Sequence, residues 1–342
     1  NDAMLTVDAV ELLPEVIDAS AHFTRDVDTA RRSRLRLVGA DARRFVRTAR
    51  EPYDLIVSDN FHPARSGSGS LYTVEHFAAV QQRLAPGGLF CQWLPLHQLD
   101  LDTLRSIVRA FLAVYPEGRA MLATNSLDTP VLGLLARRGG GGFDAARLRG
   151  RLAGAAMLRS PADFGLEDEL ALLGSFIAGP RSLARFAGTA PLNTDDHPLV
   201  AYRAPRVTYA PDSLPRDRLL ALLRELEISP EELLATPPDA ALASRLAAYG
   251  RARERFLEVG RHVQPSADVQ RMLAQVGEPL LEVLRLSPDF RPAYDPLLRM
   301  AAALARDDVA AARRLLRQLQ AAQPARREAD QLLRELPGAG LP

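Results

Sequence analysis

The sequence predicts an α/β protein in which a doubly wound, mostly parallel sheet is followed by an all-α region. Within residues 1–140, short apolar segments alternate with amphipathic helical segments, which is the pattern of repeated β-α units. Leu55, Ile56 and Val57 form a fully apolar run, as expected for a buried parallel strand. Residues 215–336 show helical periodicity almost throughout, so the sheet is expected in the N-terminal part of the chain.

Four strands and then a hairpin are predicted along the N-terminal part. The strands cover residues 5–10, 35–38, 55–57 and 89–94, and the hairpin pairs residues 121–124 with 131–136. Pro14 suits the first turn of a helix after the first strand, and Thr73 suits the N-cap of a helix that runs to residue 84. A strongly periodic helix over residues 102–115 completes the alternation.

Three regions are expected along the chain: a sheet-containing domain at 1–140, a helical and loop extension at 141–208, and a helical region at 209–342. A Gly-rich linker near residue 140 marks the first boundary. Residues 288–324 predict two helices joined at Asp307-Asp308 and resemble one tetratricopeptide hairpin, although a single unit does not predict a solenoid. The Ser229-Pro-Glu-Glu segment predicts a capping box.

Composition excludes several classes of function. All 43 basic residues are Arg, which excludes Schiff-base lysine chemistry and the P-loop lysine. Cys91 is the single cysteine, and the six His show no metal-ligand spacing, so we expect neither intrachain disulfides nor a bound metal. The net charge of +1 implies no nucleic-acid partner, and no apolar run has transmembrane length. We therefore expect a cytoplasmic protein with no membrane contact within this chain.

Carboxylates follow three consecutive predicted strands. Glu11, Asp41 and Asp59 each lie at or just beyond a strand end, and such ends face one crevice in a parallel sheet. An acid at this place suits the paired hydroxyls of a ribose, Asp41 suits an exocyclic amine such as that of adenine, and Asp59 would remain for the reacting group. Asp59 precedes Pro63 and a Gly/Ser loop, and its alternative role is to cap a turn.

The usual beginning of a nucleotide-binding sheet is missing from the sequence. Such a sheet opens with a strand and a Gly-rich turn that lets the ligand approach the backbone, whereas Asn1 leads directly into the predicted strand at 5–10. We expect the chain to be a fragment that lacks this first strand and its glycine loop.

Four segments together resemble the polyamine aminopropyltransferases, the spermidine synthase family, which has a Rossmann-like class I methyltransferase fold. They are VDAVELLPEVIDAS, VGADARRFV, YDLIVSDNFHP and LYTVEHFAAVQQRLAPGGLFCQWLPL. The later segment PLNTDDHPLVAYRAPR is similar to the bacterial branch in which this domain is fused to a membrane segment, so the parent protein is expected to carry one. The resemblance covers residues 5–205.

The resemblance implies roles for individual residues. Glu11 matches the family's ribose-binding acid, and Asp41, with Ala42 beside it, matches the adenine-binding position. Asp59 matches the acid that accepts a proton from the attacking amine, and Tyr72 matches an aromatic residue that covers the substrate. The implied co-substrate is decarboxylated S-adenosylmethionine, and the implied partner is a small-molecule amine.

His62 departs from the family pattern, because it replaces a second acid that the family has in this segment. The site for a dicationic amine thereby loses one negative charge, while a neutral His retains a lone pair that accepts a proton. His97 lies past the next strand end, where it could line the crevice, although a structural role is favoured. Asp195 and Asp196 could also face the crevice, but an Asn-Thr-Asp-Asp run is more typical of turn and cap residues.

Three functions stay open from the sequence. The first is an aminopropyltransferase with Asp59 as general base and His62 and Tyr72 at the amine site. The second is a small-molecule methyltransferase that uses S-adenosylmethionine on the same sheet. The third is a non-catalytic remnant whose helical C-terminus acts as a protein-binding module. In each case the helical region is expected to offer a surface for a homodimer or another protein.

Overall fold

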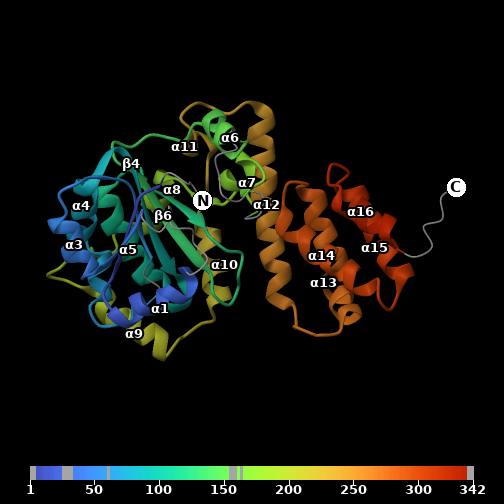
Figure 1. The fold of residues 1–342 in the computed structure, drawn as a ribbon, viewed down its shortest axis with the longest axis horizontal. Coiled ribbons are helices and arrows are strands. Elements are labelled where there is room, and N and C mark those ends of the chain that lie inside the picture. The colour runs from blue at the N-terminus through green and yellow to red at the C-terminus, as the bar shows by residue number, and fades with distance from the viewer. Residues whose placement is uncertain (1–4, 25–33, 60–61, 154–159, 162–164, 337–342) are drawn as a thin grey trace.

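The computed structural model describes residues 5–24, 34–59, 62–153, 160–161 and 165–336. An α/β part built from the N-terminal half of the chain lies beside a purely helical C-terminal part, and the long helix α12 (Ala240–His262) runs between them (Figure 1). The predicted fold class, an α/β sheet followed by an all-α region, is confirmed.

The strands form two sheets. The first pairs β1 (Val7–Glu11) with β2 (Leu35–Gly39) in parallel. The second has the order β3-β4-β6-β5-β7, with β3 at Tyr53–Ser58, β4 at Leu84–Pro95, β5 at Arg119–Leu122, β6 at Val131–Arg137 and β7 at Phe176–Ala178. The β3-β4 ladder is parallel and the remaining ladders are antiparallel, including the predicted hairpin of β5 and β6. Strands β3, β4 and β5 therefore share one direction.

The two sheets are joined through side chains. The Tyr53 hydroxyl, at the start of β3, donates to the Asp8 carboxylate of β1 at 2.7 Å, and Arg36 of β2 donates to the same carboxylate. These two donors hold the pKa of Asp8 below its usual range, with the Arg36 hydrogen bond as the larger cause. Within the described residues β1 and β3 share no backbone ladder, so the sequence-based expectation of one continuous sheet is not met.

The expectation that residues 55–57 form a fully buried strand is wrong. Leu55 and Val57 are 48% and 49% exposed, whereas Ile56, on the other face, is half-buried against the core. The reason is the position of β3: it lies at the edge of the five-stranded sheet, and β4 is its only strand neighbour among the described residues. An apolar run identifies a strand well, but it does not reveal which neighbours cover that strand.

Helices surround the strands in the order that the alternating pattern predicts. The N-terminal helices are α1 (Pro14–Thr24), α3 (Ala42–Thr48), α4 (Val74–Arg83) and α5 (Leu101–Val114), with the short 3-10 helices η1 (Ser68–Tyr72) and η2 (Leu96–Gln98) between them. As predicted, Thr73 caps α4, and its hydroxyl accepts the His76 N–H. Asp100 caps α5 in the same way.

An aromatic cluster forms the centre of the first hydrophobic core. Phe77 of α4, Phe90 of β4, and Phe111 and Tyr115 at the end of α5 pack with ring centroids between 5.1 and 6.1 Å apart. Each of these side chains is at most 2% exposed. Aromatic rings bury large apolar areas, so this cluster fixes α4 and α5 against β4.

The middle and the C-terminal parts of the chain are helical. The middle helices are α6 (Ala145–Ala153), α7 (Glu169–Leu173), α8 (Pro180–Ala187), α9 (Leu199–Tyr209), α10 (Pro215–Glu225) and α11 (Pro230–Leu233). The C-terminal helices after α12 are α13 (Val269–Leu286), α14 (Arg291–Leu304), α15 (Val309–Ala322) and α16 (Glu328–Glu335). No helix of the described segments is both long and apolar enough to cross a bilayer.

The C-terminal helices have a hydrophobic core of their own, in which Phe290, Tyr294 and Leu297 are fully buried. Helices α14 and α15 form the predicted pair, and Asp308 caps α15 by accepting the Ala311 N–H at 2.9 Å. The predicted capping box at Ser229 is wrong, because its hydroxyl bonds the Glu231 carboxylate and leaves the first turn of α11 without a side-chain cap. The expected domain boundaries and the tetratricopeptide likeness stay predictions.

Burial of one histidine makes the stability of this fold depend on pH. His76 is 2% exposed, its Nδ1 has no hydrogen-bond partner among the described residues, and burial, then Arg43 and Arg47, lower its pKa to about 4. An unfolded histidine has a pKa of about 6.5, so between these values the unfolded chain binds a proton that the folded chain excludes. Stability is therefore lost as the pH falls through this window.

We predict that His76→Phe removes this part of the pH dependence. Between pH 7 and pH 4.5 the wild-type chain should lose about 2 kcal/mol of unfolding free energy through this histidine, a loss that the variant lacks. Urea unfolding at both pH values measures the difference. His22→Phe, which changes an exposed histidine of α1, should keep the wild-type dependence. Equal pH dependence in wild type and His76→Phe would contradict the assignment.

Candidate functional site

The carboxyl end of β3 presents a carboxylate that has no hydrogen bond to any described residue. Asp59 follows Ser58 directly and is exposed on one side, while partial burial raises the pKa of its carboxyl. The Asp59 charge also raises the pKa of Tyr72 and of the Cys91 thiol, although burial is the larger cause for both. Asp59 therefore lies close to two buried groups and retains both oxygens for an incoming proton donor.

Gln92 holds the end of β3 against β4. Its side chain is fully buried, and Nε2 donates to the carbonyls of Ser58 at 3.3 Å and of Trp93 at 3.0 Å. The ladder pairs Ser58 with Gln92 itself, so the backbone immediately before Asp59 is fixed by main chain and side chain together. No local pattern predicts this role, because a Gln side chain is mostly exposed in folded proteins.

Two histidines from different segments meet at Gln98. The Gln98 amide nitrogen lies 3.4 Å from Nδ1 of His62 and 3.1 Å from Nε2 of His97. Burial, followed by the charges of Arg218 and His62, lowers the pKa of His97, which favours its neutral form. The structure thus brings His62, predicted as a substrate residue, next to His97, which had been interpreted as structural. Asn60 and Phe61, between Asp59 and His62, lie outside the described residues.

Tyr72 ends η1 and is completely buried in the first core. Burial raises the pKa of its hydroxyl far above the usual value, so the group stays protonated. A side chain in this position packs beneath the loop and does not project into solvent. Its predicted role as a cover for the substrate stays a prediction.

Glu11 and Asp41 end the two strands of the smaller sheet and make local hydrogen bonds. Oε1 of Glu11 accepts the Leu13 N–H at 3.0 Å, and Oδ1 of Asp41 accepts the Arg44 N–H at 2.8 Å as the N-cap of α3. Ala42 is the exposed first residue of that helix. Each carboxylate keeps one oxygen with no hydrogen bond to the described residues. Their use by one ligand together with Asp59 stays a prediction.

The loop that contains η1 is fastened by a segment more than a hundred residues away. Asn193 is fully buried; its Nδ2 donates to the Tyr72 carbonyl at 2.8 Å, and its Oδ1 accepts the Val200 N–H at 3.2 Å. Gly69 allows the loop to approach α9, since a Cβ at this position would lie 2.7 Å from the Ala201 nitrogen. We call residues 193–195, with these contacts, the loop clamp.

Asp195 extends the loop clamp to α3. Its carboxylate forms ion pairs with Arg43 and, at 3.3 Å, with Arg47, and the Arg43 hydrogen bond is the main reason that its pKa falls to about 2. Arg43 also donates to the Ser70 carbonyl at 3.0 Å. The helix that starts at Ala42 and the loop that ends at Tyr72 are therefore held in a fixed relation by one arginine and one aspartate. Asp195 lies in the bend at residues 195–197, and its side chain is engaged in these ion pairs.

The predicted candidates offer proton acceptors and hydrogen-bond acceptors. Among the described residues, no group of three or more His, Cys, Asp or Glu is arranged to hold a metal ion. What the arrangement can do chemically is to accept a proton at Asp59, at the carboxyl end of a parallel strand pair.

We predict that Asn193→Ala loosens the η1 loop and destabilises the fold. The substitution removes the Asn193 hydrogen bonds to the buried Tyr72 carbonyl and to the Val200 N–H, which should cost about 2 kcal/mol of unfolding free energy. Urea unfolding measures this loss. Asn125→Ala is the matched control, since Asn125 is only half-buried and makes no hydrogen bond with the described residues. An equal, small effect of both substitutions would show that the loop does not depend on Asn193.

A family model and several solved structures are similar to the N-terminal part of this chain. Residues 2–123 match the family model of the spermine/spermidine synthase domain. No curated protein matches the chain. Similar solved structures include a probable spermidine synthase from Corynebacterium glutamicum, with 22% identity and a TM-score of 0.39 over 55% of this chain and 63% of that one.

Two further solved spermidine synthases have a similar level of identity to this chain. A spermidine synthase from Thermotoga maritima has 21% identity and a TM-score of 0.37 over 53% of this chain and 59% of that one. A spermidine synthase in complex with the transition state analogue AdoDATO has 21% identity and a TM-score of 0.38 over 48% of this chain and 61% of that one. The chain thus spans less than two thirds of each of these proteins. Residues 2–123, which contain β1 to β5, are therefore similar to the spermine/spermidine synthase domain.

Proposed function

We propose that this chain is the aminopropyltransferase part of a polyamine-forming enzyme, with decarboxylated S-adenosylmethionine as donor, an amine as acceptor and Asp59 as general base. Two observations support the proposal. The family match covers the segment from β1 to β5, and Asp59 is a carboxylate of raised pKa at the end of β3 that no described residue engages.

The reaction requires a proton acceptor at this place. An aliphatic amine is protonated near neutral pH and has no lone pair until a base removes one proton. Asp59 takes that proton, and the amine nitrogen then attacks the carbon attached to the sulfonium sulfur. The new C–N bond forms as the C–S bond breaks, and the bonding electrons remain on sulfur as a neutral thioether. The raised pKa of Asp59 makes it a stronger base than an ordinary aspartate.

The donor would lie along the carboxylates of the smaller sheet. Glu11 would accept from the ribose hydroxyls, and Asp41 with Ala42 would hold the adenine. The oxygens of Glu11 and Asp41 that make no hydrogen bond with the described residues suit these roles. A cationic sulfonium is favoured near negative charge, which supports a carboxylate-lined site. The related spermidine synthase with AdoDATO supports the same class of donor.

The amine site would use His62 and Tyr72 beside Asp59. Gln98 lies within hydrogen-bond distance of Nδ1 of His62 and Nε2 of His97, and burial favours the neutral form of His97. A neutral imidazole does not repel an approaching amine, but it also supplies no second negative charge. We therefore propose that the acceptor carries fewer charges than a dicationic diamine.

The wider context of the protein is part of the proposal. We propose a cytoplasmic location, as the cytoplasmic part of a membrane-anchored parent of the fused bacterial branch. The helices α12 to α16 would then offer a surface for a second copy or another protein. These helices have their own hydrophobic core, which lets them pack without the sheet and supports a binding role separate from catalysis.

Asp59→Asn tests the proton-acceptor role. We expect turnover to fall by roughly 10²–10⁴-fold, since an amide accepts no proton, while the donor dissociation constant stays within about twofold. Mass spectrometry of the products and calorimetric titration with decarboxylated S-adenosylmethionine measure the two quantities. Asp54→Asn, an exposed carboxylate of the same strand, is the control and should leave both unchanged.

The same experiments separate the alternatives. Undiminished turnover in Asp59→Asn would end the assignment of the base. Methyl transfer from intact S-adenosylmethionine, with no aminopropyl product, would favour the methyltransferase. Absence of heat with either donor would favour a non-catalytic sheet.

A further inference from the structure

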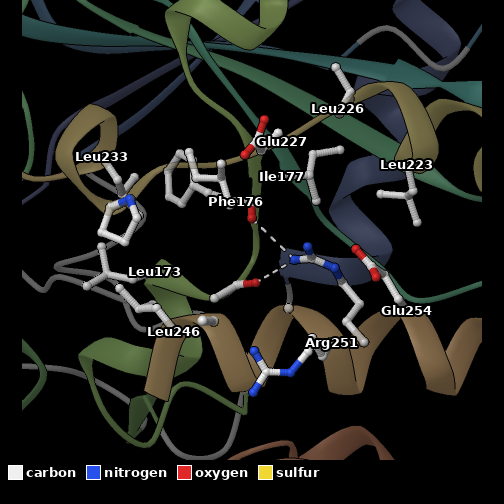
Figure 2. Close-up of a pocket in the computed structure, with 16 residues that line it drawn as sticks. Leu173, Phe176, Ile177, Leu223, Leu226, Glu227, Leu233, Leu246, Arg251 and Glu254 are labelled. Atoms are coloured by element: carbon white, nitrogen blue, oxygen red, sulfur yellow. Dashed lines mark hydrogen bonds between the residues drawn. The ribbon is translucent and has the colours of Figure 1, made fainter. Parts of the chain in front are cut away.

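A cavity of about 370 Å³ lies where the sheet meets the helical part of the chain. It is bounded by β7, by the segment that leads from α10 to α11, and by α12 (Figure 2). Its walls are mainly apolar, with side chains that include Leu173, Phe176, Ile177, Leu223, Ile228 and Leu233. This volume and lining fall within the range of small-ligand pockets in proteins.

One wall of this cavity carries a buried arginine. Arg253 of α12 is 5% exposed, and its Nη1 donates to the carbonyls of Gly174 at 2.6 Å and of Phe176 at 3.3 Å, as the dashed lines in Figure 2 show. These two bonds use both hydrogens of Nη1. Neither Nε nor Nη2 makes a hydrogen bond with a described residue, and the Nε atom is buried.

Arg253 forms no ion pair with a described residue, and the nearby charge of Glu254 acts on it only as a smaller influence than burial. Burial lowers the pKa of the guanidinium, yet an arginine stays protonated in proteins, so the charge remains. Two neutral carbonyls do not compensate a buried cation, which normally requires an anion. Glu254 and Glu227 lie at the cavity but are exposed, and neither forms an ion pair with Arg253.

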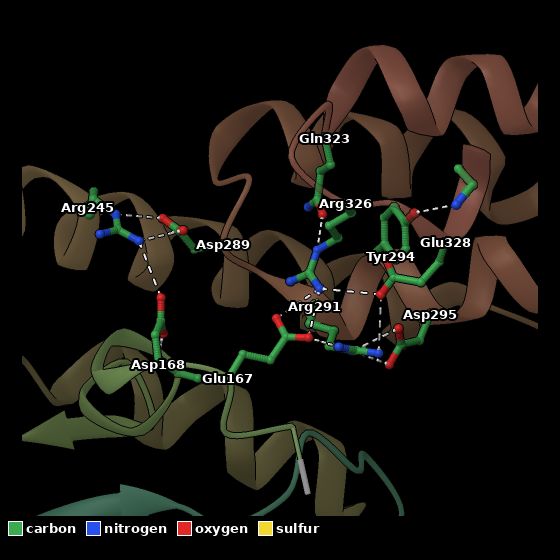
Figure 3. Close-up of polar contacts among 12 residues, drawn as sticks. Glu167, Asp168, Arg245, Asp289, Arg291, Tyr294, Asp295, Gln323, Arg326 and Glu328 are labelled. Atoms are coloured by element: carbon green, nitrogen blue, oxygen red, sulfur yellow. Dashed lines mark hydrogen bonds and ion pairs between the residues drawn. The ribbon is translucent and has the colours of Figure 1, made fainter. Parts of the chain in front are cut away.

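The carboxylates of the second cavity that Arg253 lines already form ion pairs with other arginines. Arg253 also lines a second cavity of about 550 Å³, whose acidic residues form the ion-pair network of Figure 3. In this network Glu167 pairs with Arg291 and Arg326, Asp168 and Asp289 pair with Arg245, and Asp295 pairs with Arg291. A counter-ion for Arg253 must therefore come from outside the described residues.

The geometry of the free edge indicates which kind of anion fits. Nε and Nη2 lie on the same side of a guanidinium and form a planar fork that matches the two oxygens of a carboxylate. Arg245, two turns earlier on the same helix, shows this arrangement: its Nε and Nη2 donate to the two Asp289 oxygens at 3.1 and 2.8 Å. Arg253 lines the apolar cavity, and its guanidinium forms no such pair with a described carboxylate.

We propose that this cavity binds an amphiphilic monocarboxylate, whose carboxylate group meets the Arg253 guanidinium and whose apolar body lies among the leucines and Phe176. The site lies between β7 and α12, away from Asp59, so it is separate from the proposed transferase site. Because its walls come from both the sheet and α12, a bound ligand would link the two parts of the molecule.

Three eight-carbon probes test the charge preference in the wild-type chain: octanoate, octylamine and octanol. We expect octanoate to bind at least tenfold more tightly than the other two, by calorimetric titration. Trp93 is the only tryptophan and lines the second cavity beside Arg253, so its fluorescence should change with octanoate. Equal affinities for the three probes, or no octanoate binding up to about 10 mM, would overturn the proposal.

Two variants locate the site. Arg253→Gln should weaken octanoate binding at least tenfold, while Arg255→Gln, which changes an exposed arginine paired with Glu282 on the same helix, should not. Leu246→Trp leaves Arg253 intact and fills the cavity, so it should abolish binding even if Arg253→Gln fails to fold. Wild-type affinity in Leu246→Trp, or an equal loss in both arginine variants, would contradict the site.

Discussion

The parallel pairing of β3 with β4 is the constraint on which the candidate site depends. The ladder joins Val57 to Cys91 and Ser58 to Gln92, and so determines where the chain leaves the sheet at Asp59. Phe90 of β4 is locked in the aromatic cluster, so β4 cannot shift along β3 without disrupting the core. A slip of one residue would turn Asp59 to the opposite face. The packing of Phe90 in the core thus helps to determine the position of Asp59 at the end of the neighbouring strand.

Much of the fold could be predicted from local patterns, because helices and strands form where apolar residues recur with the period of that element. Apolar runs mark β1 to β4, Thr73 caps α4, and the periodic segment at 102–115 becomes α5. Asp59 could be identified because the end of a parallel strand is a general location for ligands. These inferences need only the residues within about one helix length of each other.

The rest of the site depends on contacts between distant segments, which no local pattern reveals. Asn193 bonds a backbone carbonyl 121 positions away, and every residue type offers such a carbonyl. Gln98 links His62 to His97 only because the loop after β3 returns to η2. The exposure of Leu55 and Val57 likewise depends on which strands lie beside β3, which is a property of the sheet and not of the strand. A long-range hydrogen bond joins two particular residues in the fold, but neither the composition nor the local sequence around those residues reveals it.

The open edge of β3 also has a practical consequence. Leu55 and Val57 alternate with inward-facing residues along a strand whose second edge pairs with no strand of the described residues, and Val7 of β1 is similarly exposed. An uncovered edge of this kind is a template on which another extended peptide can align. At high concentration the polypeptide should therefore tend to self-associate through its exposed strand. Measurements of its other properties should accordingly be made on dilute samples.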